Sequence, residues 1–331
     1  MDYLKLMGGL VLLVVSGDYL VKGGVGIATR LKISSLVIGM TVVAFGTSAP
    51  EFLVSLQAAI KGNPAIAIGN VVGSNIANIA LILGMTAIVY PLWVGRNSIR
   101  YDWPAMMIAS LLFTWASMNG EIGRLEGLSF VSILVAYTAW QIIQSRKMLS
   151  QQSEVNKEDT TEDMPIWKSI GFIAISCVGL AYGADFLIDG ASNIAKSFGV
   201  SERIIGVTIV AFGTSLPELA ASMVAAFKKE TDIAIGNIVG SNIFNILSVI
   251  GMTALINPIP VEWGAFKEDY FWMLSISFIL ILLVIPFKFL FKTSKENKIS
   301  LLLNGGTLGR LGGCTLLLLY ITYIYLLLGQ S

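Results

Sequence analysis

Two stretches, AFGTSAPE at residues 44–51 and AFGTSLPE at residues 211–218, decide the fold, because each places a proline and a glutamate inside a long apolar run. Pro50 cannot donate a backbone hydrogen bond to the carbonyl of Gly46, and its ring crowds that turn. We therefore expect the helix to kink or unwind there. Irregular backbone at membrane depth is tolerated only where it is buried in protein or lines a wet cavity. Carbonyl oxygens freed beside Glu51 would suit a hard cation.

The composition places these runs in a membrane. Of the 331 residues, 55% are hydrophobic and 13% are charged, whereas soluble domains carry about a quarter charged residues. An apolar run of about 18 residues is long enough to cross a bilayer core as a helix. The sequence predicts an all-α polytopic membrane protein with ten transmembrane helices, near residues 3–28, 33–60, 65–90, 99–119, 126–145, 167–195, 200–227, 232–256, 270–290 and 308–328.

The sequence also repeats itself. Residues 18–91 match residues 185–258 at a fixed offset of 167 without a gap, and the tripeptide GRL at 123–125 returns at 309–311. Each half thus holds five expected helices, and since five is odd, the second half must enter the membrane from the opposite side. The sequence predicts two inverted five-helix repeats, at residues 1–146 and 166–331, joined by a cytoplasmic linker at residues 147–165.

Charge fixes the expected orientation. If the N-terminus lies outside, the inner loops hold 14 basic residues and the outer segments hold 6, leaving aside Lys22 and Arg310. Both termini are therefore expected to face outward. The net charge of +1 gives no reason to expect a nucleic acid as a partner.

The first motif lines one helical face with oxygen atoms. Ala44, Thr47, Ser48 and Glu51 fall at positions i, i+3, i+4 and i+7. Placing a carboxylate in the bilayer interior costs free energy, so a functional role is the first interpretation of such a residue. The structural alternatives are a glutamate paired with a basic residue and a glutamate near the surface. The second repeat presents the same set as Ala211, Thr214, Ser215 and Glu218.

A second motif follows in the next helix of each repeat, as GNVVGSNIANI at residues 69–79 and GNIVGSNIFNI at residues 236–246. Amide and hydroxyl side chains recur every four residues and share a stripe. Such a stripe can hold helices together through hydrogen bonds, but its recurrence in both repeats favours a role as ion ligands. The residues of the two stripes are Asn70, Ser74, Asn78, Asn237, Ser241 and Asn245.

The two half-sites are expected to meet near the midplane of the membrane. They offer two carboxylates and four hydroxyl groups, together with amide and carbonyl oxygens. These are hard donors, and Ca²⁺ takes six to eight oxygens in flexible geometry. Na⁺ can use the same oxygens, so the two ions can compete for one site, as antiport by alternating access requires.

The paired GTSAPE/GTSLPE and GNxVGSN segments resemble the two alpha-repeats of the sodium/calcium exchanger family, within the cation/calcium antiporter superfamily. The resemblance covers nearly the whole chain and implies the bacterial or archaeal type, without a regulatory domain, in a prokaryotic cytoplasmic (inner) membrane. It implies the ten-helix exchanger fold, whose first and sixth helices slide to switch access. The implied Ca²⁺ ligands are Glu51 and Glu218, with Thr47 and Thr214 also at the metal. Further implied ligands of Ca²⁺ or Na⁺ are Ser48, Ser215, Ser74, Ser241 and the carbonyls of Ala44 and Ala211, with Asn78 and Asn245 lining the centre.

One departure from the family pattern concerns Asn245, where many relatives, including those that also carry potassium, place Asp. The absence of that carboxylate makes potassium co-transport a poor expectation. The closest rival function is a cation/proton antiporter of the same superfamily, although such relatives carry Glu where this chain has Gly73 and Gly240. A cation channel is a more distant alternative. No enzyme activity, cofactor or obligatory protein partner is expected. The expected substrates are Ca²⁺ and Na⁺, and the protein is expected to reside in a lipid bilayer.

Overall fold

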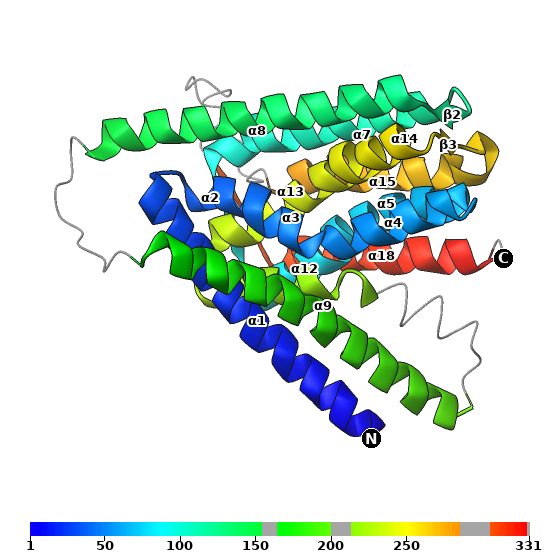
Figure 1. Cartoon of the computed structure of the whole chain (residues 1–331), viewed down its shortest axis with the longest axis horizontal. Helices are drawn as coiled ribbons and strands as arrows, with labels where there is room; N and C mark the ends of the chain where they lie inside the picture. Colours follow the sequence, from blue (N-terminus) through cyan, green and yellow to red (C-terminus); the bar gives the residue numbers. More distant parts are fainter. Residues whose placement is uncertain (154–163, 200–212, 285–304, 330–331) are drawn as a thin grey trace. The chain divides into compact units, whose positions relative to one another are not determined.

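Figure 1 shows the computed structural model of the chain, which describes residues 1–153, 164–199, 213–284 and 305–329. The described part is mostly helical and divides into two compact units. Unit 1 comprises Met1–Pro50 and Thr138–Asn237, and unit 2 comprises Glu51–Tyr137 and Ile238–Ser331. Each unit therefore takes segments from both halves of the sequence repeat.

Unit 1 is built around two long helices that run side by side in opposite directions, α1 and α9 (Figure 1). Three helices contain residues of both units: α4 and α13 begin in unit 1 and end in unit 2, and α8 begins in unit 2 and ends in unit 1. The helices that belong wholly or partly to unit 1 are α1 (Asp2–Leu31), α2 (Ser35–Ile38), η1 (Gly39–Val43), α3 (Ala44–Thr47), α4 (Ala49–Ile60), α8 (Arg124–Ser153), α9 (Ile166–Ser197), α12 (Leu216–Phe227) and α13 (Thr231–Phe244), where η marks a π-helix.

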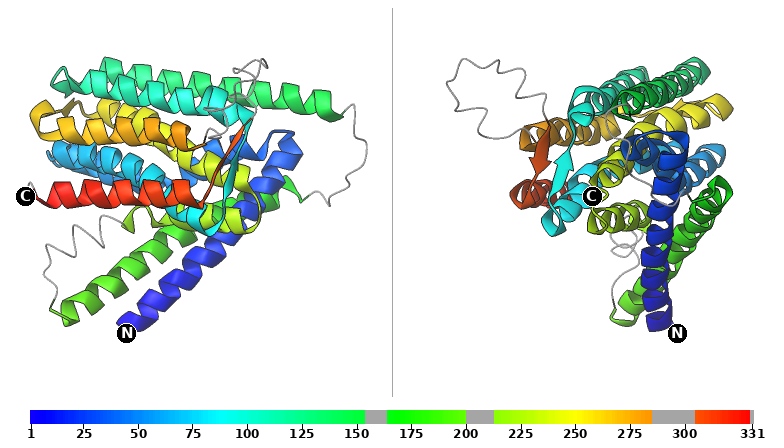
Figure 2. Two further views of the ribbon diagram at one scale, coloured as in Figure 1. Left: turned by 180° about the vertical axis from the view of Figure 1, so that it is seen from behind. Right: turned by 90° about the vertical axis from the view of Figure 1, so that its left-hand side faces the viewer.

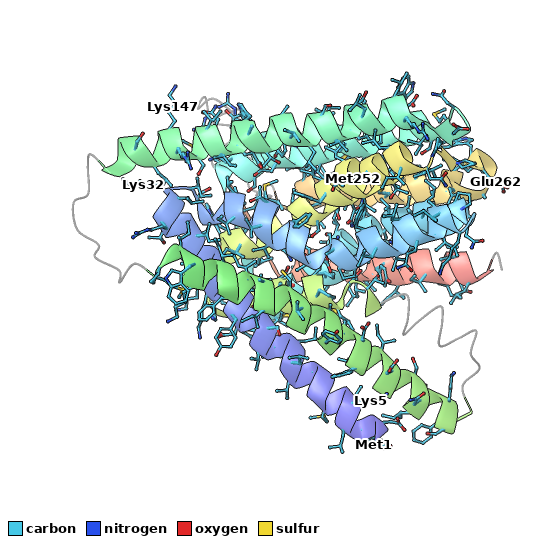
Figure 3. The ribbon with its side chains drawn as sticks, in the orientation of Figure 1. Met1, Lys5, Lys32, Lys147, Met252 and Glu262 are labelled. Atoms are coloured by element: carbon cyan, nitrogen blue, oxygen red, sulfur yellow. The ribbon has the colours of Figure 1, made fainter. Side chains whose placement is uncertain are left out.

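Glycines bring the backbones of α1 and α9 together. A Cβ at Gly9 would lie 2.6 Å from the backbone nitrogen of Leu187, and a Cβ at Gly23 would lie 2.8 Å from the carbonyl oxygen of Ser169. The ammonium of Lys5, labelled in Figure 3, pairs with the carboxylate of Asp189 at 3.2 Å. Small residues allow such close packing between membrane helices. The start of α1 thus lies against the end of α9, so the two helices are antiparallel.

The kink expected at Pro50 is confirmed. The helical run stops at Thr47, and Ser48 adopts φ −84° and ψ 6° before α4 begins at Ala49. The segments Ser35–Thr47 and Ala49–Ile60 are bent by 47°. Ser215 repeats the local backbone with φ −90° and ψ 3° at the start of α12. The first motif therefore interrupts its helix just before the proline, as the loss of its donor predicts, and in the second motif α12 begins at Leu216 after the same local backbone.

Unit 2 contains most of the remaining helices and two short antiparallel strand pairs. Strand β1 pairs with β4 and strand β2 with β3, and Figure 2 shows β1 in cyan beside β4 in orange-red. The elements of unit 2 not yet named are α5 (Pro64–Ile76), η2 (Ala77–Leu83), α6 (Gly84–Val89), β1 (Leu92–Val94), η3 (Ser98–Asp102), α7 (Trp103–Ser117), β2 (Glu121–Ile122), η5 (Asn245–Ile250), α14 (Gly251–Ile256), β3 (Ile259–Pro260), α15 (Trp263–Val284), β4 (Gly306–Leu308) and α18 (Arg310–Gly329).

A tyrosine–aspartate hydrogen bond occurs once in each half of the chain. The hydroxyl of Tyr137 donates to Oδ1 of Asp102 at 2.9 Å, and that of Tyr323 donates to Oδ1 of Asp269 at 2.9 Å. The two aspartates are separated by the 167-residue offset, and the two tyrosines by the larger offset of the GRL tripeptides. The same contact therefore fastens equivalent segments in both halves: the end of η3, which leads into α7, to α8, and α15 to α18.

Close glycine contacts recur in the same way. A Cβ at Gly84 would lie 3.1 Å from the carbonyl oxygen of Gly313, and a Cβ at Gly251 would lie 3.2 Å from that of Gly127. Gly84 and Gly251 are equivalent in the repeat, as are Gly127 and Gly313. Each half thus contributes a helix that packs, through glycine, against the last helix of the other half.

Several of the described helices have the length and hydropathy of membrane-spanning helices. Six helices are long and apolar enough to cross a membrane, and a seventh is added if the bent pair Ser35–Thr47 and Ala49–Ile60 forms one broken span. Each of the ten expected runs overlaps a helix, but those at residues 200–227 and 270–290 extend beyond the described part. The helical membrane class is therefore confirmed, and the number ten stays a prediction.

Candidate functional site

In unit 1, Glu218 lies in the first turn of α12, which begins after Ser215 and contains Pro217 as its second residue. Its side chain is fully buried, and its Oε1 accepts a hydrogen bond from the hydroxyl of Ser48 at 3.2 Å. Within the described residues, its Oε2 has no hydrogen-bond partner and no basic side chain pairs with it. A buried carboxylate oxygen without a donor is costly, so this oxygen is suited to a cation.

Thr47 and Asn237 continue this cluster in unit 1. The Thr47 hydroxyl lies 3.1 Å from Oδ1 of Asn237 and 3.3 Å from the carbonyl oxygen of Ala44. The Asn237 amide nitrogen donates to the hydroxyl of Ser222 at 2.9 Å and to the carbonyl oxygen of Glu218 at 3.4 Å. Asn237 therefore ties the start of α12 to α13 and holds the backbone at the glutamate in place.

In unit 2, Asn70 makes the equivalent pair of hydrogen bonds next to Glu51. The amide nitrogen of Asn70 donates to the carbonyl oxygen of Glu51 at 3.2 Å and to the hydroxyl of Ser55 at 2.9 Å. Glu51 is 1% exposed, in the first turn of α4. Both glutamates are thus buried, with their backbone carbonyls fixed by an asparagine of the following long helix.

The two serines that accept hydrogen bonds from Asn70 and Asn237 were not predicted from the sequence. Ser55 and Ser222 each follow a motif glutamate by four residues, on the same helical face, and they are equivalent in the repeat. Their recurrence at the 167-residue offset is the signal that could have found them.

Asn78 and Asn245 lie in π-helical turns of unit 2, η2 and η5. Such turns are rare and occur often at functional sites. Both side chains are buried, at 1% and 0% exposed, and the Oδ1 of each lacks a hydrogen-bond partner among the described residues. Two amide oxygens are thus present that could bind a cation.

The remaining expected ligands can be placed individually. Ser74 and Ser241 are buried in α5 and α13, Ser215 is buried before α12, and Thr214 is half-buried. Ala211 lies outside the described residues. Burial excludes the alternative that the motif glutamates lie at the surface of the protein.

The chain matches known proteins along nearly its full length. The family model described as sodium/calcium exchanger protein matches residues 2–143 and 168–329. The inner membrane protein YrbG of Escherichia coli is 36% identical over 84% of this chain and 87% of its own. The sodium/calcium exchanger MaX1 of Methanosarcina acetivorans is 31% identical over 86% of this chain and 91% of its own.

A solved structure agrees with these relatives. The sodium-calcium exchanger NCX_Mj, soaked without Na⁺ and Ca²⁺, superposes with a TM-score of 0.77 at 29% identity and covers 98% of both chains. The buried glutamates and the two matched stretches thus occur in a fold shared with a known exchanger. The chain belongs to the sodium/calcium exchanger protein family.

Proposed function

We propose that this membrane protein is a secondary antiporter that exchanges Ca²⁺ for Na⁺ by alternating access. The observation that carries the proposal is Glu218, a buried carboxylate whose Oε1 accepts from Ser48 and whose Oε2 has no protein donor among the described residues. Hard oxygens in a dry interior favour Ca²⁺ and Na⁺ over softer metals. Family membership supports the same function, and it does not favour the proton-coupled alternative.

The ligand assignment is part of this proposal. Glu51 and Glu218 supply the charge for Ca²⁺, together with Thr47 and Thr214. The burial of both glutamates supports this assignment, because an ionised carboxylate in the membrane interior needs a compensating charge. The remaining oxygens that we assign to Ca²⁺ or Na⁺ belong to Ala44, Ala211, Ser48, Ser215, Ser74, Ser241, Asn78 and Asn245.

We further propose ten transmembrane helices in two inverted repeats. The helices α1 and α9 are equivalent in the sequence repeat and antiparallel in unit 1, as an inverted duplication requires. The recurring tyrosine–aspartate and glycine contacts of unit 2 support the same symmetry. Residues 1–146 and 166–331 would form the repeats, with residues 147–165 between them.

The proposed orientation places both termini outside a prokaryotic cytoplasmic membrane. Figure 3 shows Lys32 and Lys147 at one end of unit 1 and Met1 and Lys5 at the other. The backbone nitrogen of Ser34 also donates to the hydroxyl of Ser145 at 2.6 Å. The basic residues after the first and fifth expected helices therefore share one end of this unit, in keeping with a common cytoplasmic side.

Cysteine labelling tests this orientation. In a background with Cys177 and Cys314 replaced by Ala, we expect a membrane-impermeant maleimide to label Glu262→Cys in intact cells. Lys147→Cys should react only after the cytoplasmic face has been exposed, because the two exposed positions are expected on opposite sides. The reverse pattern would invert the proposed topology.

Uptake of ⁴⁵Ca²⁺ into proteoliposomes tests the function itself. We expect an outward Na⁺ gradient to drive uptake, while a K⁺ gradient or a pH gradient alone drives none above protein-free vesicles. Uptake driven by pH alone would assign the chain to proton-coupled antiport. Uptake that needs no ion on the opposite side would indicate a channel.

A further inference from the structure

Four buried asparagines form a network in unit 2. The amide nitrogen of Asn78 donates to Oδ1 of Asn242 at 3.0 Å, and that of Asn245 donates to Oδ1 of Asn75 at 3.4 Å. Each pair joins an amide from one repeat to an amide from the other. Asn75 and Asn242 are equivalent in the repeat and lie outside the proposed ligand set. All four side chains are at most 1% exposed.

The orientation of the Asn242 amide is fixed by a backbone group. Its Nδ2 donates to the carbonyl oxygen of Asn75 at 3.2 Å, and a carbonyl oxygen can only accept. A flipped Asn242 would place two acceptors together, so its Oδ1 must face Asn78. Asn78 must then offer Nδ2 to this oxygen, which turns its own Oδ1 away from Asn242.

The orientation imposed on Asn78 leaves its buried Oδ1 free to bind a cation in the proposed site. Its Oδ1 has no hydrogen-bond partner among the described residues. An unsatisfied buried acceptor is unfavourable unless a donor or a cation reaches it. The hydrogen bond from Asn78 to Asn242 thus keeps an oxygen, instead of an NH₂ group, available to a cation.

The Asn75 amide is held less firmly than that of Asn242, which lies 3.7 Å from the equivalent sulfur, of Met106, and also donates to a backbone carbonyl oxygen. The Asn75 amide nitrogen lies 3.8 Å from the sulfur of Met273, and a thioether is a poor acceptor. The bond that Asn75 accepts from Asn245 is also the longer of the two, at 3.4 Å. Asn75 therefore constrains Asn245 less than Asn242 constrains Asn78.

We propose that Asn242 is a positioning residue that holds the Asn78 carboxamide with its oxygen toward the transported cation. Asn75 does the same, less firmly, for Asn245. The inference rests on the proposed function, because it requires Asn78 and Asn245 to be ligands. It adds two residues that act through those ligands and do not touch the ion.

The first test replaces Asn242 by leucine, which has a similar shape but no acceptor. The Asn78 amide can then rotate and present NH₂ to the cation. We expect the apparent Ca²⁺ affinity to fall by about tenfold to 100-fold. Ca²⁺ dependence of ⁴⁵Ca²⁺ uptake and the Ca²⁺-induced rise in melting temperature measure this loss. Asn75→Leu should show a smaller loss.

A double-mutant cycle separates positioning from general structure. In an Asn78→Ala background, Asn242→Leu should change the Ca²⁺ affinity less than about twofold, because no ligand remains to be oriented. Asn257→Ala is the matched control, since it removes an amide hydrogen bond of 2.8 Å to the carbonyl of Ala59 in the same unit. This variant should lower the melting temperature and leave the affinity unchanged.

The outcomes also separate this inference from the proposed function. If Asn78→Ala keeps the wild-type affinity, the ligand assignment fails. If Asn78→Ala weakens binding but Asn242→Leu only lowers the melting temperature without Ca²⁺, the positioning role is overturned. Additive losses in the cycle would overturn it as well. Asn242→Ala, which removes the same acceptor with less bulk, serves the same comparisons if the leucine variant does not fold.

Discussion

Replacing Glu218 by glutamine is expected to abolish Ca²⁺ transport while the protein stays inserted and folded. The glutamine side chain would still accept from the Ser48 hydroxyl, which lies 3.2 Å from Oε1, so the local hydrogen bond survives. Half of the charge facing a divalent ion is lost. At ligand distances of about 2.3–2.6 Å, that loss is worth roughly several kcal/mol, or more than about 100-fold in affinity. Glu51→Gln should behave alike in ⁴⁵Ca²⁺ uptake.

Glu262→Gln provides the control for this pair. Glu262 is exposed between β3 and α15, so the change removes the same charge away from the buried cluster and should leave uptake unchanged. Protons should compete with Ca²⁺ for the buried carboxylates, so lowering the pH should inhibit wild-type transport. Transport retained by Glu51→Gln or Glu218→Gln would remove the central claim of the proposed function.

Transport is expected to move one positive charge in the direction of sodium and to be independent of potassium. With Asn245 neutral, the proposed centre carries two carboxylates, a formal charge of −2. One Ca²⁺ or two Na⁺ neutralise it, and a third Na⁺ would leave the occupied centre at +1, so we expect exchange of three Na⁺ for one Ca²⁺. One charge is worth about 2.3 kcal/mol per 100 mV, so 100 mV should change the equilibrium Ca²⁺ ratio roughly 50-fold. Reversal of ⁴⁵Ca²⁺ flux under imposed potentials and Na⁺ gradients measures this charge.

Asn245→Asp gives the matched comparison. The introduced aspartate would add a third carboxylate to the centre without changing the size of the side chain. Asn75 could turn its amide nitrogen toward that carboxylate, since it gives up only the weak contact to Met273. If the Na⁺ gradient at which wild-type Ca²⁺ flux reverses does not depend on the imposed membrane potential, exchange for three Na⁺ is contradicted. Exchange for two Na⁺ or two H⁺ would then be indicated.

Much of the fold was accessible to sequence reasoning because its determinants are local or repeated. The helix interruption at Ser48 follows from the missing donor of Pro50, which depends on no distant contact. The equivalence of Glu51 and Glu218 follows from the offset, and both are buried in first turns of helices.

Other features depend on tertiary packing and were not predicted. A spacing of four residues places Asn70, Ser74 and Asn78 on one helical face, and this pattern does not include Asn75. Asn75 lies three residues before Asn78, a spacing that also shares a helical face, but only the packing of α5 against η5 reveals its contacts. The π-helical turns were not expected either, since the periodicity argument assumed uniform α-helix.

The composition of the two compact units has a consequence for biosynthesis. Unit 1 becomes complete only when Asn237 has been made, and unit 2 needs the last helix, α18, although its first part ends at Tyr137. The polar face of α5 therefore leaves the ribosome long before Asn242, the residue that pairs with Asn78. During that interval, Asn78 lacks the hydrogen-bond partner that Asn242 later provides. Neither half of the gene encodes a complete compact unit, so a chain interrupted within residues 147–165 would have to assemble from two fragments.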